Sequence, residues 1–87
     1  MRFDQQNAIR EYVRALSDDD LRYIGSRLLD RLGGDLGDAI NAMGRNRSVD
    51  EVFRSARGPW DVYDVCDYAR DTMLDEAEGR GMISSGG

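Results

Sequence analysis

The chain contains no histidine and no lysine, and all twelve of its basic residues are arginine. Histidine is the commonest proton shuttle near neutral pH and the commonest nitrogen ligand for metals, and lysine supplies the amine of Schiff bases. Their absence excludes the reactions that depend on those side chains. The composition therefore favours binding over catalysis, and we expect no cofactor.

Cysteine and long apolar runs are also scarce. The single cysteine, Cys66, excludes a disulfide within the chain. No apolar run approaches the core of a signal peptide or the length of about 20 residues that spans a membrane. We therefore expect a cytoplasmic protein with no membrane segment. Cys66 falls among the apolar positions of its segment, so we interpret it as a buried hydrophobe rather than a reactive thiol.

The length and the apolar pattern predict one helical domain. The 87 residues leave room for a single core. Apolar residues recur at helical spacing, and nowhere do they alternate with polar residues as in a strand. We predict an all-α fold of four or five short helices in a small orthogonal or irregular bundle, with no sheet. Residues 1–79 form the predicted domain, and residues 80–87, which are mostly small and polar, form a flexible tail.

Capping residues and glycines indicate where the helices begin and end. Ser17 has the position of an N-cap, and Ser48 with Glu51 has the spacing of a capping box. Phe3 is expected to pack beside the first helix. The predicted helices cover 5–16, 18–32, 36–43, 49–56 and 60–78, and the most regular apolar ridge consists of Leu21, Ile24, Leu28 and Leu32.

Charge is distributed unevenly along the chain. Up to Gly58 there are ten arginines and ten acidic residues, whereas from Pro59 onward there are two arginines and seven acidic residues. The last third therefore carries the whole net charge of −5. This distribution indicates a local electrostatic role for the last predicted helix.

Acidic residues recur every three or four positions through that helix. At about 100° per residue they fall on one side, nearly opposite the apolar face that includes Cys66 and Met73. We call this set the acidic stripe, and its members are Asp61, Asp64, Asp67, Asp71, Asp75 and Glu78.

The acidic stripe is either the solvated face of an amphipathic helix or a docking surface for a basic partner. Our functional hypothesis is the second: a small protein-interaction module without enzymatic activity, with Tyr68 as the aromatic anchor among the acids. One concrete form is an inhibitor or adaptor, of phage or bacterial origin, that occupies a basic groove. A nucleic-acid mimic is another, because carboxylates one helical turn apart have a spacing near that of phosphates in a strand.

Two other functions stay open at this point. Carboxylates on one helix face can bind a divalent metal for chemistry on phosphate compounds, but the other helices offer few acids to complete such a site, so we assign no metal ligand.

The second alternative is a helix-turn-helix formed by the second and third predicted helices, although the acidic helix would repel nucleic acid. The phosphate contacts in that alternative would come from a secondary basic patch of Arg45, Arg47, Arg54 and Arg57. The alternative, purely structural interpretation of this basic patch is a set of surface ion pairs. A second copy of the chain is also a candidate partner, which would give a homo-oligomer.

Overall fold

The computed structural model describes residues 1–29 and 35–83. Within those residues the chain forms five α-helices and no strand, which confirms the predicted all-α fold. No helix in this described part combines the length and the apolar character needed to cross a membrane. The helices are α1 (Phe3–Ala15), α2 (Asp18–Leu29), α3 (Asp35–Met43), α4 (Arg47–Arg54) and α5 (Pro59–Gly79). Leu32, at which the second helix was predicted to end, lies outside the described residues.

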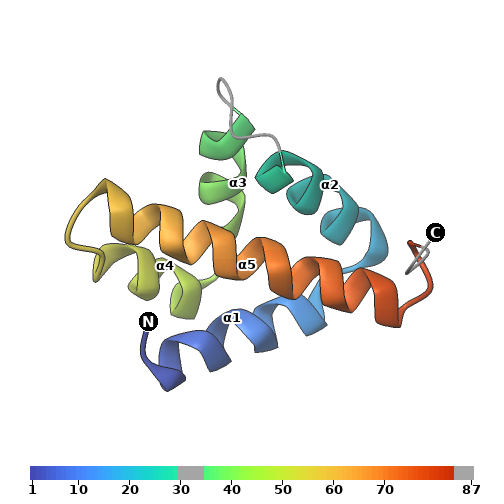
Figure 1. Ribbon diagram of the computed structural model, residues 1–87, viewed down its shortest axis with the longest axis horizontal. Coiled ribbons are helices and arrows are strands. Elements are labelled where there is room, and N and C mark those ends of the chain that lie inside the picture. Colours follow the sequence, from blue (N-terminus) through green and yellow to red (C-terminus); the bar gives the residue numbers. More distant parts are fainter. Residues whose placement is uncertain (30–34, 84–87) are drawn as a thin grey trace.

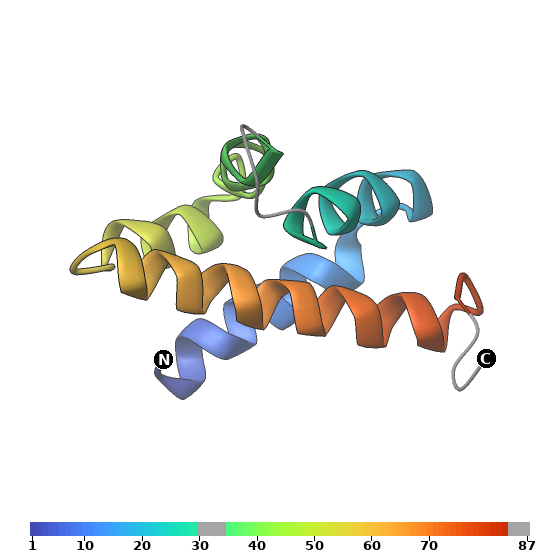
Figure 2. The same cartoon turned by 45° about the horizontal axis from the view of Figure 1, so that its top comes forward.

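The longest helix, α5, connects the rest of the fold. Its 21 residues extend for about 31 Å at 1.5 Å per residue, in a molecule whose longest dimension is 37 Å. Helices α1 and α2 both pack against α5, while α4 packs on α1 and α3 packs on α2. Two helix pairs therefore lie along one long helix, and α3 crosses α5 steeply (Figures 1 and 2). This arrangement is an irregular bundle, as predicted.

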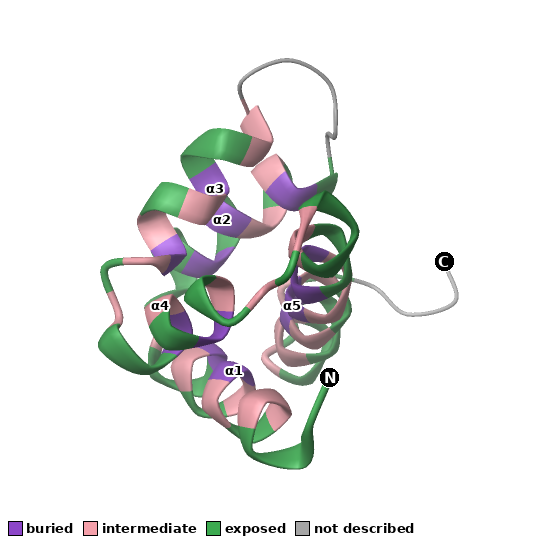
Figure 3. Ribbon diagram, turned by 90° about the vertical axis from the view of Figure 1, so that its left-hand side faces the viewer, coloured by how far each residue is buried: buried purple, intermediate pink, exposed green. Residues whose placement is uncertain are grey.

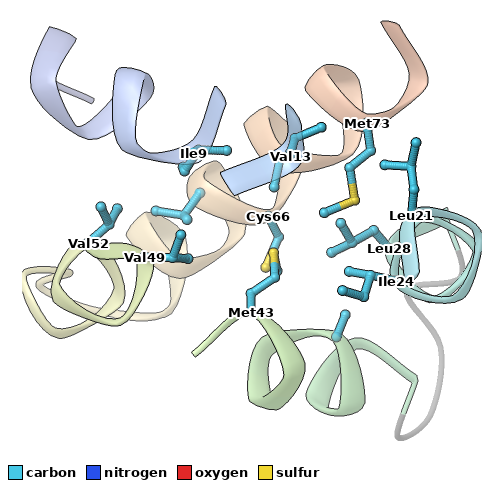
Figure 4. Packing of buried hydrophobic residues seen from close by; sticks show 13 residues of the cluster. Ile9, Val13, Leu21, Ile24, Leu28, Met43, Val49, Val52, Cys66 and Met73 are labelled. Atoms are coloured by element: carbon cyan, nitrogen blue, oxygen red, sulfur yellow. The ribbon is translucent and has the colours of Figure 1, made fainter. Parts of the chain in front are cut away.

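The core lies where α5 faces the two helix pairs. Met73 of α5 points toward the apolar ridge of α2, and Cys66 points toward Met43 of α3 (Figure 4). The burial of Cys66 was predicted from its place on the apolar face of α5. Val65, which we had not assigned to that face, is buried as well. The apolar face of α5 is therefore wider than the sequence pattern indicated, because Val65 lines a hollow together with Gln5 of α1 and Val52 of α4.

The predicted N-cap is confirmed for α2 but not for α4. The Ser17 Oγ accepts the Asp20 backbone N–H at 3.1 Å, so the predicted N-cap of α2 is confirmed. The predicted capping box of Ser48 and Glu51 is wrong. The N-cap of α4 is Asn46, whose side chain accepts the Val49 N–H at 3.2 Å. Asparagine caps helices as well as serine does, so the helix begins two residues earlier than predicted.

The prediction that Phe3 packs beside the first helix is also wrong. Phe3 is instead the first residue of α1, and it is 74% exposed. Its ring lies under the guanidinium of Arg10, and the distance from the Arg10 Cζ to the centre of the Phe3 ring is 5.6 Å. Because α1 starts two residues earlier than predicted, Phe3 falls on the solvent side of the helix rather than in a preceding turn.

The end of α5 turns the chain back onto the helix. Gly81 has a φ of 76°, the left-handed conformation that glycine adopts most readily. The Met82 N–H donates to the Ala77 carbonyl at 2.9 Å and the Gly81 N–H donates to the Glu78 carbonyl at 3.0 Å, which is a Schellman motif. Met82 consequently packs against the edge of the core. Arg80, Gly81 and Met82, which the sequence placed in the tail, thus belong to the cap of α5.

Candidate protein-interaction surface

The acidic stripe lies on an unbroken helix. Residues 59–79 form α5 without interruption. The side of α5 that faces the other helices is buried, and its opposite side is exposed (Figure 3). Asp67 is half-buried, and the other five members of the stripe are exposed. The structure therefore presents one strongly charged surface along most of the length of the molecule.

Few cations neutralise the acidic stripe. Arg70 lies 3.7 Å from Asp67 and 3.2 Å from Asp71, measured between guanidinium nitrogen and carboxylate oxygen. Among the residues that the structure describes, the carboxylates of three members form no hydrogen bond or ion pair. These three are Asp64, Asp75 and Glu78. These three carboxylates are distributed over nearly four helical turns, and Asp67 and Asp71, which pair with Arg70, lie between Asp64 and Asp75.

Asp61 has a structural role at the start of the stripe. Its carboxylate accepts the Arg57 backbone N–H at 2.8 Å, which ties the loop before α5 to the first turn of that helix. An acidic side chain in the first turn also interacts favourably with the helix dipole. Local structure is thus sufficient to explain Asp61, in contrast to Asp64, Asp75 and Glu78.

Tyr68, the predicted aromatic anchor, is less exposed than two other aromatic residues of α5. Tyr68 is half-buried and packs against the core. Trp60, in the first turn of α5, is 80% exposed, and its ring centre lies 6.2 Å from that of the exposed Tyr63. On a helix, Trp60 lies one turn before Asp64, so it shares the side of the stripe. The i,i+4 spacing of Trp60 and Asp64 is already present in the sequence.

Local acids neutralise much of the basic patch. The Arg54 Nε lies 2.7 Å from an Asp50 carboxylate oxygen, and the Arg47 Nε lies 3.8 Å from one of Glu51. Each of these pairs lies on α4 at i,i+4 spacing. Arg45 lies apart from them and lines a shallow hollow with Tyr12 and Asp20. The four arginines therefore do not form one uncompensated surface.

The hollow beside Arg45 gives a pH-dependent prediction. Burial raises the pKa of Tyr12 above its ordinary value of 10.0, Asp20 adds to this rise, and Arg45 opposes it. The folded protein thus holds the phenol proton more tightly than the unfolded chain does. The resulting stabilisation is complete below pH 10 and disappears as the pH rises through the folded-state pKa. We expect the urea midpoint of the Tyr12→Phe variant to fall less than that of the parent between pH 9 and pH 11. Equal declines would contradict the raised pKa.

A groove with a mostly apolar lining runs between α2 and α5. Its floor includes buried side chains, and its rim includes exposed ones. Met82, brought back by the cap of α5, lines one side of it. We call this feature the α2–α5 groove, and its apolar lining includes Leu21, Leu29, Met73, Leu74, Ala77 and Met82. The groove could not be predicted from the sequence, because it depends on how two helices meet rather than on one helical pattern.

The two alternative functions gain no support from the geometry. Within residues 1–29 and 35–83, no three histidine, cysteine or acidic side chains gather in a way that could hold a metal ion. In the α2–α3 pair, Arg27 of α2 lies 3.9 Å from Asp38 of α3, so α3 presents an acid rather than a base beside α2. Comparisons of the chain with protein-family models, with curated proteins and with solved structures find no match.

Proposed function

We propose that this protein is a small non-enzymatic interaction module that docks the exposed side of α5 on a basic surface of a partner protein. The observation that carries the proposal is the set of three exposed carboxylates, Asp64, Asp75 and Glu78, that have no partner among the described residues. Carboxylates that neither cap a helix nor pair with a cation contribute little to folding, and they are free to meet a cationic surface.

Aromatic side chains on the same side of α5 support docking rather than simple solvation. Trp60 and Tyr63 are exposed and lie against each other at the start of the helix. Tryptophan and tyrosine are enriched among the residues that dominate binding energy at protein interfaces. Charge then increases the rate of encounter with a basic partner, while the aromatic pair supplies apolar area for a stable complex.

Binding accounts better than catalysis for the groups present. The chain has neither histidine nor lysine, and the acids of α5 lie in a line along one helix instead of converging on one point. A line of charge suits recognition of an extended surface. It does not by itself position a reacting atom.

The test compares two variants of equal charge. The stripe variant carries Asp64→Asn, Asp75→Asn and Glu78→Gln, and the control variant carries Asp4→Asn, Glu11→Gln and Asp19→Asn on α1 and α2. Each removes three negative charges from a net charge of −5 and leaves −2. The replaced acids of the control variant form only exposed surface contacts, so both variants should remain folded.

Both variants and the parent are immobilised and exposed to a lysate of the source organism, and the captured proteins are quantified by mass spectrometry. We expect a partner that the parent and the control variant retain equally, and that the stripe variant retains about tenfold less. The partner should elute in 1 M salt, where the Debye length is about 3 Å. Equal retention by all three proteins would refute the proposal.

A further inference from the structure

We propose that the α2–α5 groove receives the apolar face of an amphipathic helix of the partner, whose basic flank then lies on the acidic stripe. This inference rests on the proposed function, because it specifies the kind of partner that meets the stripe. Helices that bind in grooves insert apolar side chains at i, i+3, i+4 and i+7, and their polar side chains contact the rim. The α2–α5 groove offers both a place for such side chains and a charged rim.

The groove leaves apolar side chains in contact with water. Leu29 on the α2 side is 58% exposed, and Leu74 on the α5 side is 36% exposed. Between them, the floor includes Leu21 and Met73, which belong to the buried core. Contiguous exposed apolar surface on a small domain marks an interaction site more often than scattered exposed leucines do. An apolar helix face would bury this surface.

Gly25 contributes no side chain to the α2 side of the groove. It lies in the interior of α2, where glycine is less favourable than any residue except proline. Its backbone does not have a positive φ, and a Cβ atom at this position would meet nothing within 4 Å. Neither backbone conformation nor close packing therefore requires glycine here. The effect of the missing side chain is open space in the lining of the groove.

Acidic residues of α5 beside the groove favour a partner helix that has basic residues next to its apolar face. On α5, Asp71 lies one turn before Leu74 and Glu78 lies one turn after it, so both carboxylates adjoin the rim. Arg70 also lines the groove, but Asp71 lies 3.2 Å from its guanidinium. On the opposite side, Arg22 of α2 lines the groove, and its carboxylate partner Asp19 lies 3.8 Å away. The acidic character is therefore confined to the α5 side of the rim. A helix with basic residues next to its apolar ridge is complementary to it, and an acidic one is not.

A partner helix fits this surface better than a second copy does. Of the four arginines in the basic patch that another copy would present, Arg47 and Arg54 already pair with Glu51 and Asp50 on their own helix. Docking of a second copy would have to break or share these pairs. The occupant that we propose is accordingly a basic amphipathic helix of another protein.

The test uses a synthetic basic helix as its probe. The peptide has about 18 residues, or five helical turns, with leucine at i, i+3, i+4 and i+7 and arginine along one flank. A second peptide has the same composition in an order that spreads leucine around the helix. Affinities for the folded protein are measured by isothermal titration calorimetry. The variants are Gly25→Leu, which fills the groove, and Gly37→Leu, a matched change at an exposed glycine of α3 whose Cβ would also meet nothing within 4 Å.

We expect the amphipathic peptide to bind the parent and the Gly37→Leu variant equally, and to bind the Gly25→Leu variant about tenfold more weakly or worse. The stripe variant should also bind it more weakly. The reordered peptide should bind more weakly than the amphipathic one and should be insensitive to Gly25→Leu. Because leucine favours a helix more than glycine does, loss of folding cannot explain the effect of Gly25→Leu.

Other results would overturn one proposal or the other. If Gly25→Leu has no effect while the stripe variant binds weakly, the groove is not the docking site and the proposed function stands. If only Gly25→Leu weakens binding, the acidic stripe has no role and the proposed function falls. A parent dimer in sedimentation velocity that Gly25→Leu dissociates would make a second copy the occupant, and would refute the partner helix.

Discussion

Replacing Leu28 by alanine should lower the free energy of unfolding by about 2–5 kcal/mol, the usual cost of removing a large buried aliphatic side chain. Leu28 is 2% exposed and belongs to the buried ridge of α2 that faces α5 and α3. A domain of this size has a total stability of about 5–15 kcal/mol. The variant should therefore lose a large part of its stability, and its thermal midpoint should fall by roughly 10 °C or more.

The next residue along the chain supplies the control for this change. Leu29 is 58% exposed on the rim of the α2–α5 groove, and its replacement by alanine removes the same atoms. We expect the stability of the Leu29→Ala variant to change by only about 0.5 kcal/mol, as for most surface substitutions. Urea unfolding followed by circular dichroism measures both values. Similar losses for the two variants would mean that α2 does not bury the side that the structure assigns to the core.

The fold could largely be predicted because local signals agree with one another. The apolar ridge of α2 follows the helical period, Ser17 caps it, and Pro59 begins α5 as its fixed φ allows. The errors arose where two residues could fill the same local role. Asn46 and Ser48 are both good N-caps, and the sequence alone does not say which one lies at the turn from α3. Phe3 was misplaced for a related reason, since a helix start without a strong cap can shift by a turn.

The candidate surface could be predicted only in part. The acidic stripe follows from periodicity on one helix, and its exposure follows from the apolar face opposite to it. The pairing of Arg70 with Asp67 and Asp71 is also local. The α2–α5 groove, in contrast, depends on the spacing and angle of two helices and on the return of Met82 after the cap of α5. Those quantities come from tertiary packing, which no single helical pattern contains.

Arg80 should contribute more to stability than any other arginine in the described part of the chain, and its replacement by alanine should cost about 1–3 kcal/mol. Its side chain is only 22% exposed, and its guanidinium lies 2.9 Å from Asp18 at the start of α2. The same group donates to the carbonyls of Val13 and Arg14 at 3.4 and 3.2 Å. One cation thus satisfies the end of α1, where the helix dipole favours positive charge, and links it to α2 and α5.

Two comparisons separate this role from a general effect of charge. The Arg22→Ala variant removes an arginine whose carboxylate partner, Asp19, is 3.8 Å away on an exposed surface, and it should leave stability nearly unchanged. The Arg80→Lys variant keeps the charge but loses the planar fork that reaches several oxygens at once, so it should fall between the parent and Arg80→Ala. A double-mutant cycle of Arg80→Ala with Asp18→Ala then measures the direct coupling, which should be at least about 0.5 kcal/mol. If the cycle shows no coupling and the Arg80→Lys variant is as stable as the parent, Arg80 contributes only its charge, and its contacts do not hold the three helix ends together.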